Sequence, residues 1–293
     1  MKLAVVGHVE WVDFVLVDRL PARGEIVAAR DAWEAPAGGG AVAASALRSL
    51  TGDAAFFCAV GRDWRGFATL EDLRGGGLKV VAGMRGDRDQ RRTVTYLTAG
   101  GERTITVLAP PLVPHGADGL SWAELEDYDG VLFFAGDAAA ARACRAAKVM
   151  VSTGRARAAL LEAGVQVDAL VGSADDADEA VDDELLMATR PRWVVATEGE
   201  RGGAWWANGE GAAEGSRDQR RGSGPDAAGR WPATPPPGEP VDAFGCGDAF
   251  AAALMAALAA GRPITDACAL GARVGAALLC ERAPAVGDLA HLW

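Results

Sequence analysis

One stretch near the C-terminal end carries the residue types best suited to chemistry. It reads Asp242-Ala-Phe-Gly-Cys-Gly-Asp248 and leads directly into the apolar segment Ala249–Leu258. The two glycines leave the backbone free for a tight turn and for close approach of a ligand, and the Ala- and Leu-rich segment favours a helix. The turn at 245–247 is therefore expected to open a helix whose unpaired N–H groups bind an anion.

Asp248 follows this turn and is expected in the first helical turn, beside the bound anion. A carboxylate at that place can take the proton from a hydroxyl that attacks phosphorus. The pattern thus indicates phosphoryl transfer, with Asp248 as general base and the backbone of Gly245, Cys246 and Gly247 as the anion hole. The alternative is an ordinary turn in which Asp248 caps the helix. These residues alone leave both interpretations open.

The composition limits the classes of partner. The chain has 293 residues, half of them hydrophobic, and a net charge of −11, which argues against nucleic acid or an anionic membrane as the main partner. The five cysteines are scattered and form no zinc-binding pattern, as expected of reduced thiols in a cytoplasmic protein. No apolar run approaches the roughly 20 residues of a membrane span.

The elements that must position these residues have two different patterns. Short buried runs alternate with Ala-rich helical segments, which predicts a parallel sheet with ligands at the C-terminal ends of its strands; the runs are Leu3–Val6, Ala54–Val60, Val131–Phe134, Val149–Val151 and Ala169–Val171. Alternating apolar and polar residues in Pro21–Pro36, and in the hairpin Thr93–Leu97 with Thr104–Leu108, predict a small lid sheet or edge strands of the main sheet.

The stretch 242–248 resembles the Asp-Thr-x-Gly-Ala-Gly-Asp signature of the PfkB/ribokinase family of sugar and nucleoside kinases, with Ala243 and Cys246 in place of Thr and Ala. Further motifs follow the family's order along nearly the whole chain. The resemblance implies an α/β fold of the ribokinase-like, Rossmann-type kind: a three-layer sandwich with a mostly parallel central sheet, spanning residues 1–293 as one domain. It also implies a small β lid contributed by about 12–34 and 91–108.

The resemblance also implies where an acceptor binds. In the family, an Asp in Gly-x-x-x-x-Asp holds sugar hydroxyls, and Gly7-His-Val-Glu-Trp-Val-Asp13 is similar with a slightly different spacing. Asp13 is thus expected to bind the acceptor; the alternative is a solvent-facing position at a strand edge. Gly38 and Gly39 resemble the glycines that approach the sugar, although the family's Asn is replaced by Val42 or Ala43. Trp11 either stacks on a nucleoside base or packs in the lid.

The nucleotide and metal positions follow in the same way. Ser173 and Asp176 stand where the family has Asn-x-x-Glu, which organises magnesium and phosphate through water; the alternative is an acidic helix cap. Thr197, Gly199 and Gly202 match the Thr-x-Gly-x-x-Gly nucleotide loop, and Gly245 and Gly247 would also contact the nucleotide. By the resemblance, Asp242 is assigned to a monovalent-cation site.

These expectations predict an ATP-dependent kinase that phosphorylates a hydroxyl of a sugar or sugar-like molecule, with ATP and Mg²⁺, and the resemblance adds K⁺ as a candidate cation. The alternatives are a nucleoside kinase, or a catalytically weak binding or sensor protein of the same fold. Neither GxxxxGK[ST] nor GxGxxG occurs at the expected places, which disfavours a P-loop kinase and a dinucleotide oxidoreductase. A homodimer through the lid is a further possibility.

The segment from about Asn208 to Pro240 is rich in Gly, Arg, Pro and Glu. Its prolines exclude a helix or central strand around 233–238. We therefore expect a surface loop that is dispensable for folding.

Overall fold

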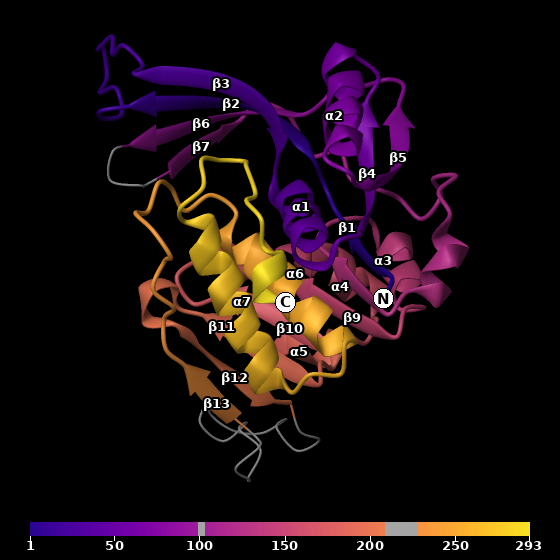
Figure 1. Cartoon of the computed structure of the whole chain (residues 1–293). Coiled ribbons are helices and arrows are strands. Elements are labelled where there is room, and N and C mark those ends of the chain that lie inside the picture. Colours follow the sequence, from indigo (N-terminus) through magenta and orange to yellow (C-terminus); the bar gives the residue numbers. More distant parts are fainter. Residues whose placement is uncertain (99–102, 209–227) are drawn as a thin grey trace.

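A nine-stranded sheet runs through the described part of the chain, which comprises residues 1–98, 103–208 and 228–293 of the computed structural model (Figure 1). In sheet order the strands are β13 (Ala228–Trp231), β12 (Gly203–Ala207), β11 (Trp193–Thr197), β10 (Ala169–Ser173), β9 (Val149–Thr153), β8 (Gly130–Phe133), β1 (Leu3–Val6), β4 (Ala55–Gly61) and β5 (Lys79–Arg85). Only β12 and β13 are antiparallel to their neighbours among these strands. The mostly parallel sheet confirms the predicted fold class.

Helices cover both faces of this sheet and make three layers (Figure 1). One face carries α1 (Gly39–Thr51), α2 (Trp64–Gly75), α6 (Cys246–Ala259) and α7 (Ile264–Leu278), and the other carries α3 (Ala138–Cys144), α4 (Arg157–Ala163) and α5 (Asp183–Thr189). Side chains of β1 alternate between the two cores, because successive residues of a strand point to opposite faces. Short 3₁₀ turns complete the layers: η1 (Trp122–Asp127), η2 (Gly154–Ala156), η3 (Ala177–Glu179), η4 (Gly199–Arg201) and η5 (Ala290–Leu292).

A second, four-stranded sheet projects from the body of the molecule at the top of Figure 1. Its order is β3 (Asp31–Ala37), β2 (Glu10–Val17), β6 (Arg92–Thr98) and β7 (Arg103–Val107). These strands fall in the segments predicted to form the lid, and we call this sheet the lid. The stretch around Ile26 and Val27 is not a strand, and Ile26 is fully exposed. The expected turn at 99–102 lies outside the described residues.

The inner face of the lid packs on the body. Val12 and Phe14 of β2 and Leu97 of β6 form a small core against Phe244, from the loop before α6, and Ala283. Phe14 meets the Phe244 ring edge-on, with centroids 5.3 Å apart. The lid therefore rests directly on the loop that was predicted to bind an anion.

The segment between Asn208 and Pro240 differs from the expected loop. Residues 209–227 lie outside the described part, but β13 pairs antiparallel with β12 and extends the main sheet. Trp231 of β13 is 8% exposed and stacks on Phe250 of α6, with ring centroids 5.5 Å apart. Burial of a large aromatic side chain outweighs the weak strand signal of Ala-Gly-Arg-Trp, so this end of the segment belongs to the core.

All five cysteines are free thiols, and three of them are buried: Cys58, Cys144 and Cys268. Within the described ranges, no helix combines the length and the apolar character that crossing a bilayer requires.

Candidate active site

The N-terminus of α6 opens as the sequence predicts. Gly245 caps the helix with φ +77°, and a Cβ there would lie 2.5 Å from Cγ1 of Val42, so both the conformation and the space require glycine. No atom lies within 4 Å of a Cβ placed on Gly247, which leaves that backbone open to a ligand. Burial raises the pKa of the Cys246 thiol to about 12, so this thiol is protonated at neutral pH.

Asp248 stands in the first turn of α6 and is half-buried. Removal from water raises the pKa of its carboxyl to about 7, and the nearby carboxylate of Glu179 adds to this effect. The guanidinium groups of Arg103 and Arg155 oppose the rise, and Glu10 adds to it more weakly. A carboxyl with a pKa near neutrality is suited to accept a proton from a hydroxyl.

The glycine-rich turn before α1 meets Asp248. A Cβ on Gly39 would lie 3.1 Å from Oδ1 of Asp248 and 2.4 Å from Cε1 of Phe134. A Cβ on Gly38 would lie 3.0 Å from Cγ of Glu10. The structure thus brings the predicted Gly38 and Gly39 together with Asp248, although about 200 residues separate them along the chain.

Asp13 is not part of this cluster, in contrast to the prediction. On β2, Glu10, Val12 and Phe14 face inward, whereas Asp13 faces outward and forms an ion pair with Arg92 at 2.7 Å. Because strand side chains alternate, one extra residue in the spacing moves the carboxylate to the opposite face. Glu10 is the carboxylate of β2 that acts on Asp248.

Glu10 is buried and lies beside Arg91, with Oε2 2.8 Å from Nε. Burial raises the pKa of Glu10, and the charge of Arg91 works against that rise. His8 lines the same place: burial lowers its pKa to about 4, so its ring is neutral at neutral pH. Glu10 and His8 thus place a buried carboxylate and a neutral ring beside Gly38.

Trp11 is not part of this cluster. It lies on the outer face of β2, where its indole N–H donates to Glu34 at 2.6 Å and its ring meets Trp64 edge-on. The interpretation of Trp11 as a base-stacking residue is therefore replaced by packing.

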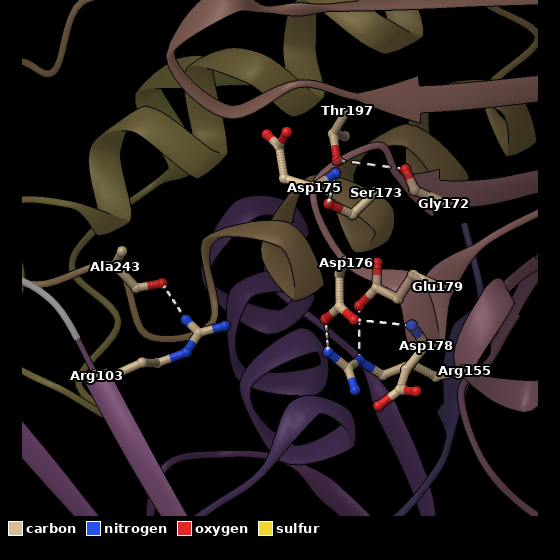
Figure 2. Close-up of polar contacts among 10 residues, drawn as sticks. All are labelled: Arg103, Arg155, Gly172, Ser173, Asp175, Asp176, Asp178, Glu179, Thr197 and Ala243. Atoms are coloured by element: carbon tan, nitrogen blue, oxygen red, sulfur yellow. Dashed lines mark hydrogen bonds and ion pairs between the residues drawn. The ribbon is translucent and has the colours of Figure 1, made fainter.

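The predicted nucleotide residues lie at the C-terminal ends of neighbouring strands. Ser173 of β10 is directly opposite Thr197 of β11, and the Thr197 hydroxyl donates to the carbonyl of Gly172 at 3.3 Å (Figure 2). The turn Gly199–Arg201 follows at once, and the Glu198 N–H closes it by donating to the carbonyl of Gly202. Ser173, Thr197, Gly199 and Gly202 are thus grouped at one edge of the sheet.

An acidic pair held by Arg155 lies next to this group (Figure 2). Arg155 contacts Oδ2 of Asp176 at 2.5 Å and Oε1 of Glu179 at 2.6 Å. Asp176 also accepts the N–H of Asp178, so it caps the 3₁₀ turn as the alternative interpretation proposed. Glu179 is fixed in place because its backbone carbonyl packs against Gly154 and Gly172, where a Cβ would come within 2.4 and 2.6 Å of it.

Asp242 connects two segments of the chain through hydrogen bonds. Its buried carboxylate accepts the N–H of Phe244 at 2.8 Å and the N–H of Ala283 at 3.0 Å. It therefore fixes the loop before α6 to the segment after α7 and acts first as a structural anchor.

Sequence reasoning missed several residues that the fold places around Asp248: His8, Glu10, Arg103, Phe134, Arg155 and Glu179. Counting every second residue along β2 from the buried Val12 would have found Glu10, because residues two apart in a strand point to the same face of the sheet. The arginines carry no local signal, because each reaches the site from a different strand end.

The comparisons with known proteins concern the family and the fold. The model of the family described as "pfkB family carbohydrate kinase" matches residues 1–288. No curated protein matches the chain.

Solved structures share the fold. A microbiome-derived acarbose kinase has a TM-score of 0.77 at 20% identity, covering 99% of this chain and 97% of that one. Ribokinase from Arabidopsis thaliana, complexed with ribose and ATP, has a TM-score of 0.71 at 18% identity (99% and 98% covered). Phosphofructokinase-2 from Escherichia coli, in complex with potassium, has a TM-score of 0.68 at 16% identity (99% and 96% covered). The chain belongs to the pfkB family of carbohydrate kinases.

Proposed function

We propose that this carbohydrate kinase transfers the γ-phosphoryl group of ATP to a hydroxyl of a neutral sugar or sugar-like molecule, with Asp248 as general base. The observation that carries the proposal is the meeting of Asp248, the open N-terminus of α6 at Gly247 and the turn at Gly39. This arrangement supports a proton acceptor beside an anion site, which phosphoryl transfer requires.

The chemistry assigned to these residues is an in-line displacement. The acceptor hydroxyl gives its proton to Asp248 while its oxygen forms a bond to the γ-phosphorus. The bond from that phosphorus to the bridging oxygen breaks, and its electron pair leaves with ADP. The N–H groups of Gly245, Cys246 and Gly247 stabilise the charge on the transferring group. Ser173, Thr197, Gly199 and Gly202 are proposed to hold the nucleotide.

The acidic pair suits magnesium. Mg²⁺ prefers oxygen ligands and binds through one or two carboxylates together with phosphates and water. Asp176 and Glu179 present such oxygens beside Ser173, and no hydrogen bond or ion pair from the described residues engages Oε2 of Glu179. We propose that these two residues hold Mg²⁺ through water; the bound ion would neutralise phosphate charge. We thus add Glu179 to Asp176 as a proposed magnesium-binding residue.

A monovalent cation suits Asp242 less directly. Both carboxylate oxygens already accept backbone N–H groups. Potassium is present in the Escherichia coli phosphofructokinase-2 structure. For this chain, binding of a monovalent cation by Asp242 stays a prediction, beside the two backbone hydrogen bonds that Asp242 accepts.

The acceptor class is supported by the pairing of charges. Arg91 and Arg155 are both paired with carboxylates, and the carboxylate of Glu10 acts on that of Asp248. This balance of charges favours hydroxyl groups over a second anionic group on the acceptor.

A screen of sugars and nucleosides for ATP consumption in the presence of Mg²⁺ tests the proposal. We expect turnover with at least one neutral sugar or sugar derivative. Turnover confined to nucleosides would favour the nucleoside kinase, and sugar binding without any phosphorylated product would favour the sensor.

The raised pKa of Asp248 predicts a specific pH profile. A general base must be ionised, so kcat/KM for the acceptor should rise about tenfold per pH unit below the pKa of about 7 and level off above pH 8. Rates at pH 5 to 9 with saturating ATP measure this profile. A rate that is flat from pH 5 to 8 would contradict the role of Asp248.

Glu10 and Asp13 form a matched pair for testing the acceptor site. Glu10→Gln should weaken acceptor binding about tenfold, because a hydrogen bond to a charged group is worth about 1.5–3 kcal/mol and one to a neutral group roughly 1 kcal/mol. Asp13→Asn, on the outer face of the same strand, should leave acceptor affinity within about twofold. Calorimetry with acceptor and with ATP measures both. Equal effects of the two substitutions would show that the faces of β2 are assigned wrongly.

A homodimer through the lid stays a prediction. The side chains of Ile105 and Val107 on β7 are 44% and 52% exposed and are apolar surface that a second chain would cover.

A further inference from the structure

Two arginines in Figure 2 are held in different ways. Arg103 donates a hydrogen bond to the backbone carbonyl of Ala243 at 2.6 Å, so its partner is an uncharged group. Arg155 instead spans the acidic pair, Asp176 and Glu179: its Nη2 donates to Oδ2 of Asp176 and its Nε to Oε1 of Glu179. One guanidinium thus takes one oxygen from each of the two carboxylates.

These oxygens are the ones that a magnesium ion at this place would use. Hydrated Mg²⁺ binds through one or two carboxylates together with phosphates. Oδ1 of Asp176 accepts the N–H of Asp178, and the next two oxygens accept from Arg155. Within the described part of the chain, only Oε2 of Glu179 is left without a hydrogen bond or ion pair. The acidic pair therefore offers both carboxylates to a metal only when Arg155 has left them.

The two carboxylates do not depend on Arg155 for their positions. A Cβ on Gly154, the residue before Arg155, would lie 2.4 Å from the backbone carbonyl oxygen of Glu179, so the two chain segments are in close contact. Asp176 caps the 3₁₀ turn η3 by accepting the N–H of Asp178 at 3.0 Å. Since these contacts involve the backbone, the carboxylates keep their places when the guanidinium moves.

The exposure of the three side chains allows this exchange. The Arg155 side chain is 39% exposed, and those of Asp176 and Glu179 are 37% and 21% exposed. Ion pairs with this access to water contribute little net free energy, because water and salt compete with them. Arg155 therefore neutralises the acidic pair without being locked onto it.

The start of α6 is the second place that the charge of Arg155 reaches. Burial would lower the pKa of the Arg155 guanidinium, but Glu179, Asp176 and, more weakly, Asp248 raise it. In return, Arg155 opposes the raised pKa of Asp248. Asp248 stands beside the helix start where the phosphates of the nucleotide are proposed to bind. A forked guanidinium is well suited to phosphate, so a bound nucleotide offers Arg155 an alternative anionic partner.

We propose that Arg155 competes with Mg²⁺ for the acidic pair, and that nucleotide phosphates draw its guanidinium away, so that metal and nucleotide bind together. This proposal rests on the proposed kinase function. With Arg155 on the acidic pair, one of the two negative charges is compensated and the oxygens are shared. With Arg155 on the phosphates, both carboxylates are open to the metal. One side chain then couples the two binding events.

The first test is a titration of the full chain with Mn²⁺ in the absence of nucleotide. Mn²⁺ takes the same oxygen ligands as Mg²⁺, and electron paramagnetic resonance measures the free ion. Arg155→Gln should bind Mn²⁺ at least tenfold more tightly than the wild type, because the competing charge is removed. Arg155→Lys keeps the charge without the fork and should lie between the two. Unchanged Mn²⁺ affinity in Arg155→Gln would overturn the proposal.

Arg157 provides the matched control. It lies two residues further along the chain and also pairs with two carboxylates, those of Asp182 and Glu184. Arg157→Gln should leave the Mn²⁺ affinity within about threefold of the wild type. Adding Glu179→Gln to Arg155→Gln should abolish the gain in affinity, which places the ion on the acidic pair. Equal gains from Arg155→Gln and Arg157→Gln would mean that only net charge acts, and the competition would be refuted.

The second test repeats the Mn²⁺ titration with saturating ADP. If the phosphates hold Arg155, its removal no longer uncovers the acidic pair, so Arg155→Gln and the wild type should bind Mn²⁺ within about threefold of each other. A tenfold difference that persists with ADP would show that Arg155 stays on the carboxylates, and the coupling between metal and nucleotide would have to be abandoned.

Thermal melting checks that each variant is folded, and Arg155→Lys carries the test in the same direction if Arg155→Gln does not fold. The Mn²⁺ titrations need no turnover. If the acceptor screen yields no phosphorylated product, the proposed function fails, and the titrations still decide whether Arg155 competes with the metal.

Discussion

Replacing Asp248 by Asn is expected to lower kcat by roughly 10²–10⁴, the usual contribution of a general base. Asn keeps the size and the hydrogen-bonding shape of the side chain but cannot take the hydroxyl proton. ATP affinity should remain within a few fold, because the proposed nucleotide contacts at Thr197 and Gly247 are untouched. Steady-state kinetics with an identified acceptor, together with calorimetry on ATP, measure both quantities.

Asp266 provides the matched control for this substitution. It also stands in the first turn of a long helix, α7, but it is exposed. If acidic residues at these positions act only through the helix dipole, Asp248→Asn and Asp266→Asn should both leave kcat nearly unchanged. Retention of most activity in Asp248→Asn would reduce Asp248 to a helix-capping residue.

The same substitution has a predictable effect on stability. The folded pKa of Asp248, about 7, lies above the ordinary value near 4. A carboxyl of this kind opposes folding once it is ionised, and this cost grows as pH rises from about 4 through 7. The Asn variant should therefore melt at the same or a higher temperature than the wild type at pH 8, which separates loss of activity from loss of fold.

Replacing Trp231 by Ala is expected to lower the free energy of unfolding by about 3–5 kcal/mol, the usual cost of removing a buried large aromatic side chain. Trp231 stacks on Phe250 of α6, and its ring covers Gly203, where a Cβ would lie 2.2 Å from Cζ2. Loss of the indole leaves a cavity between β13 and α6. Denaturant unfolding, analysed as a two-state transition, measures the change.

The neighbouring Arg230 is the control. Its side chain is 56% exposed and pairs with Glu198 at the surface, so Arg230→Ala should cost at most about 1 kcal/mol. Similar, small effects of both substitutions would support the original expectation that the whole segment from 208 to 240 is dispensable for folding.

Local sequence patterns were sufficient to predict the helices and strands of the main sheet and the helix start at Gly-Cys-Gly-Asp. The Gly-Cys-Gly-Asp stretch predicts its own helix start, because turn, helix propensity and acid occur within a few consecutive residues. The alternation of buried runs and helical segments likewise predicts the parallel sheet, and the Ser173 and Thr197 positions follow from the rule that parallel strands end at one edge.

The faces and partners of the side chains were decided by the tertiary structure. Asp13 and Glu10 lie in the same short strand, and the sequence makes either carboxylate a candidate. The packing of Val12 and Phe14 on Phe244 decides that Glu10 faces inward, where it acts on Asp248. Trp231 is buried because α6 offers Phe250, a contact that no local pattern around Trp231 encodes.

The sequence by itself therefore determined the fold class, the family resemblance and the place of Asp248 at the start of its helix, since these depend on residues close together along the chain. The tertiary structure alone decided that Glu10, Arg103, Arg155 and Glu179 gather around Asp248. Arg103 and Ala243 are 140 residues apart, and such contacts arise only when the lid, the sheet edge and the two helix starts pack together. Their physical basis is the burial of apolar faces over long sequence separations, which the spacing of residues does not record.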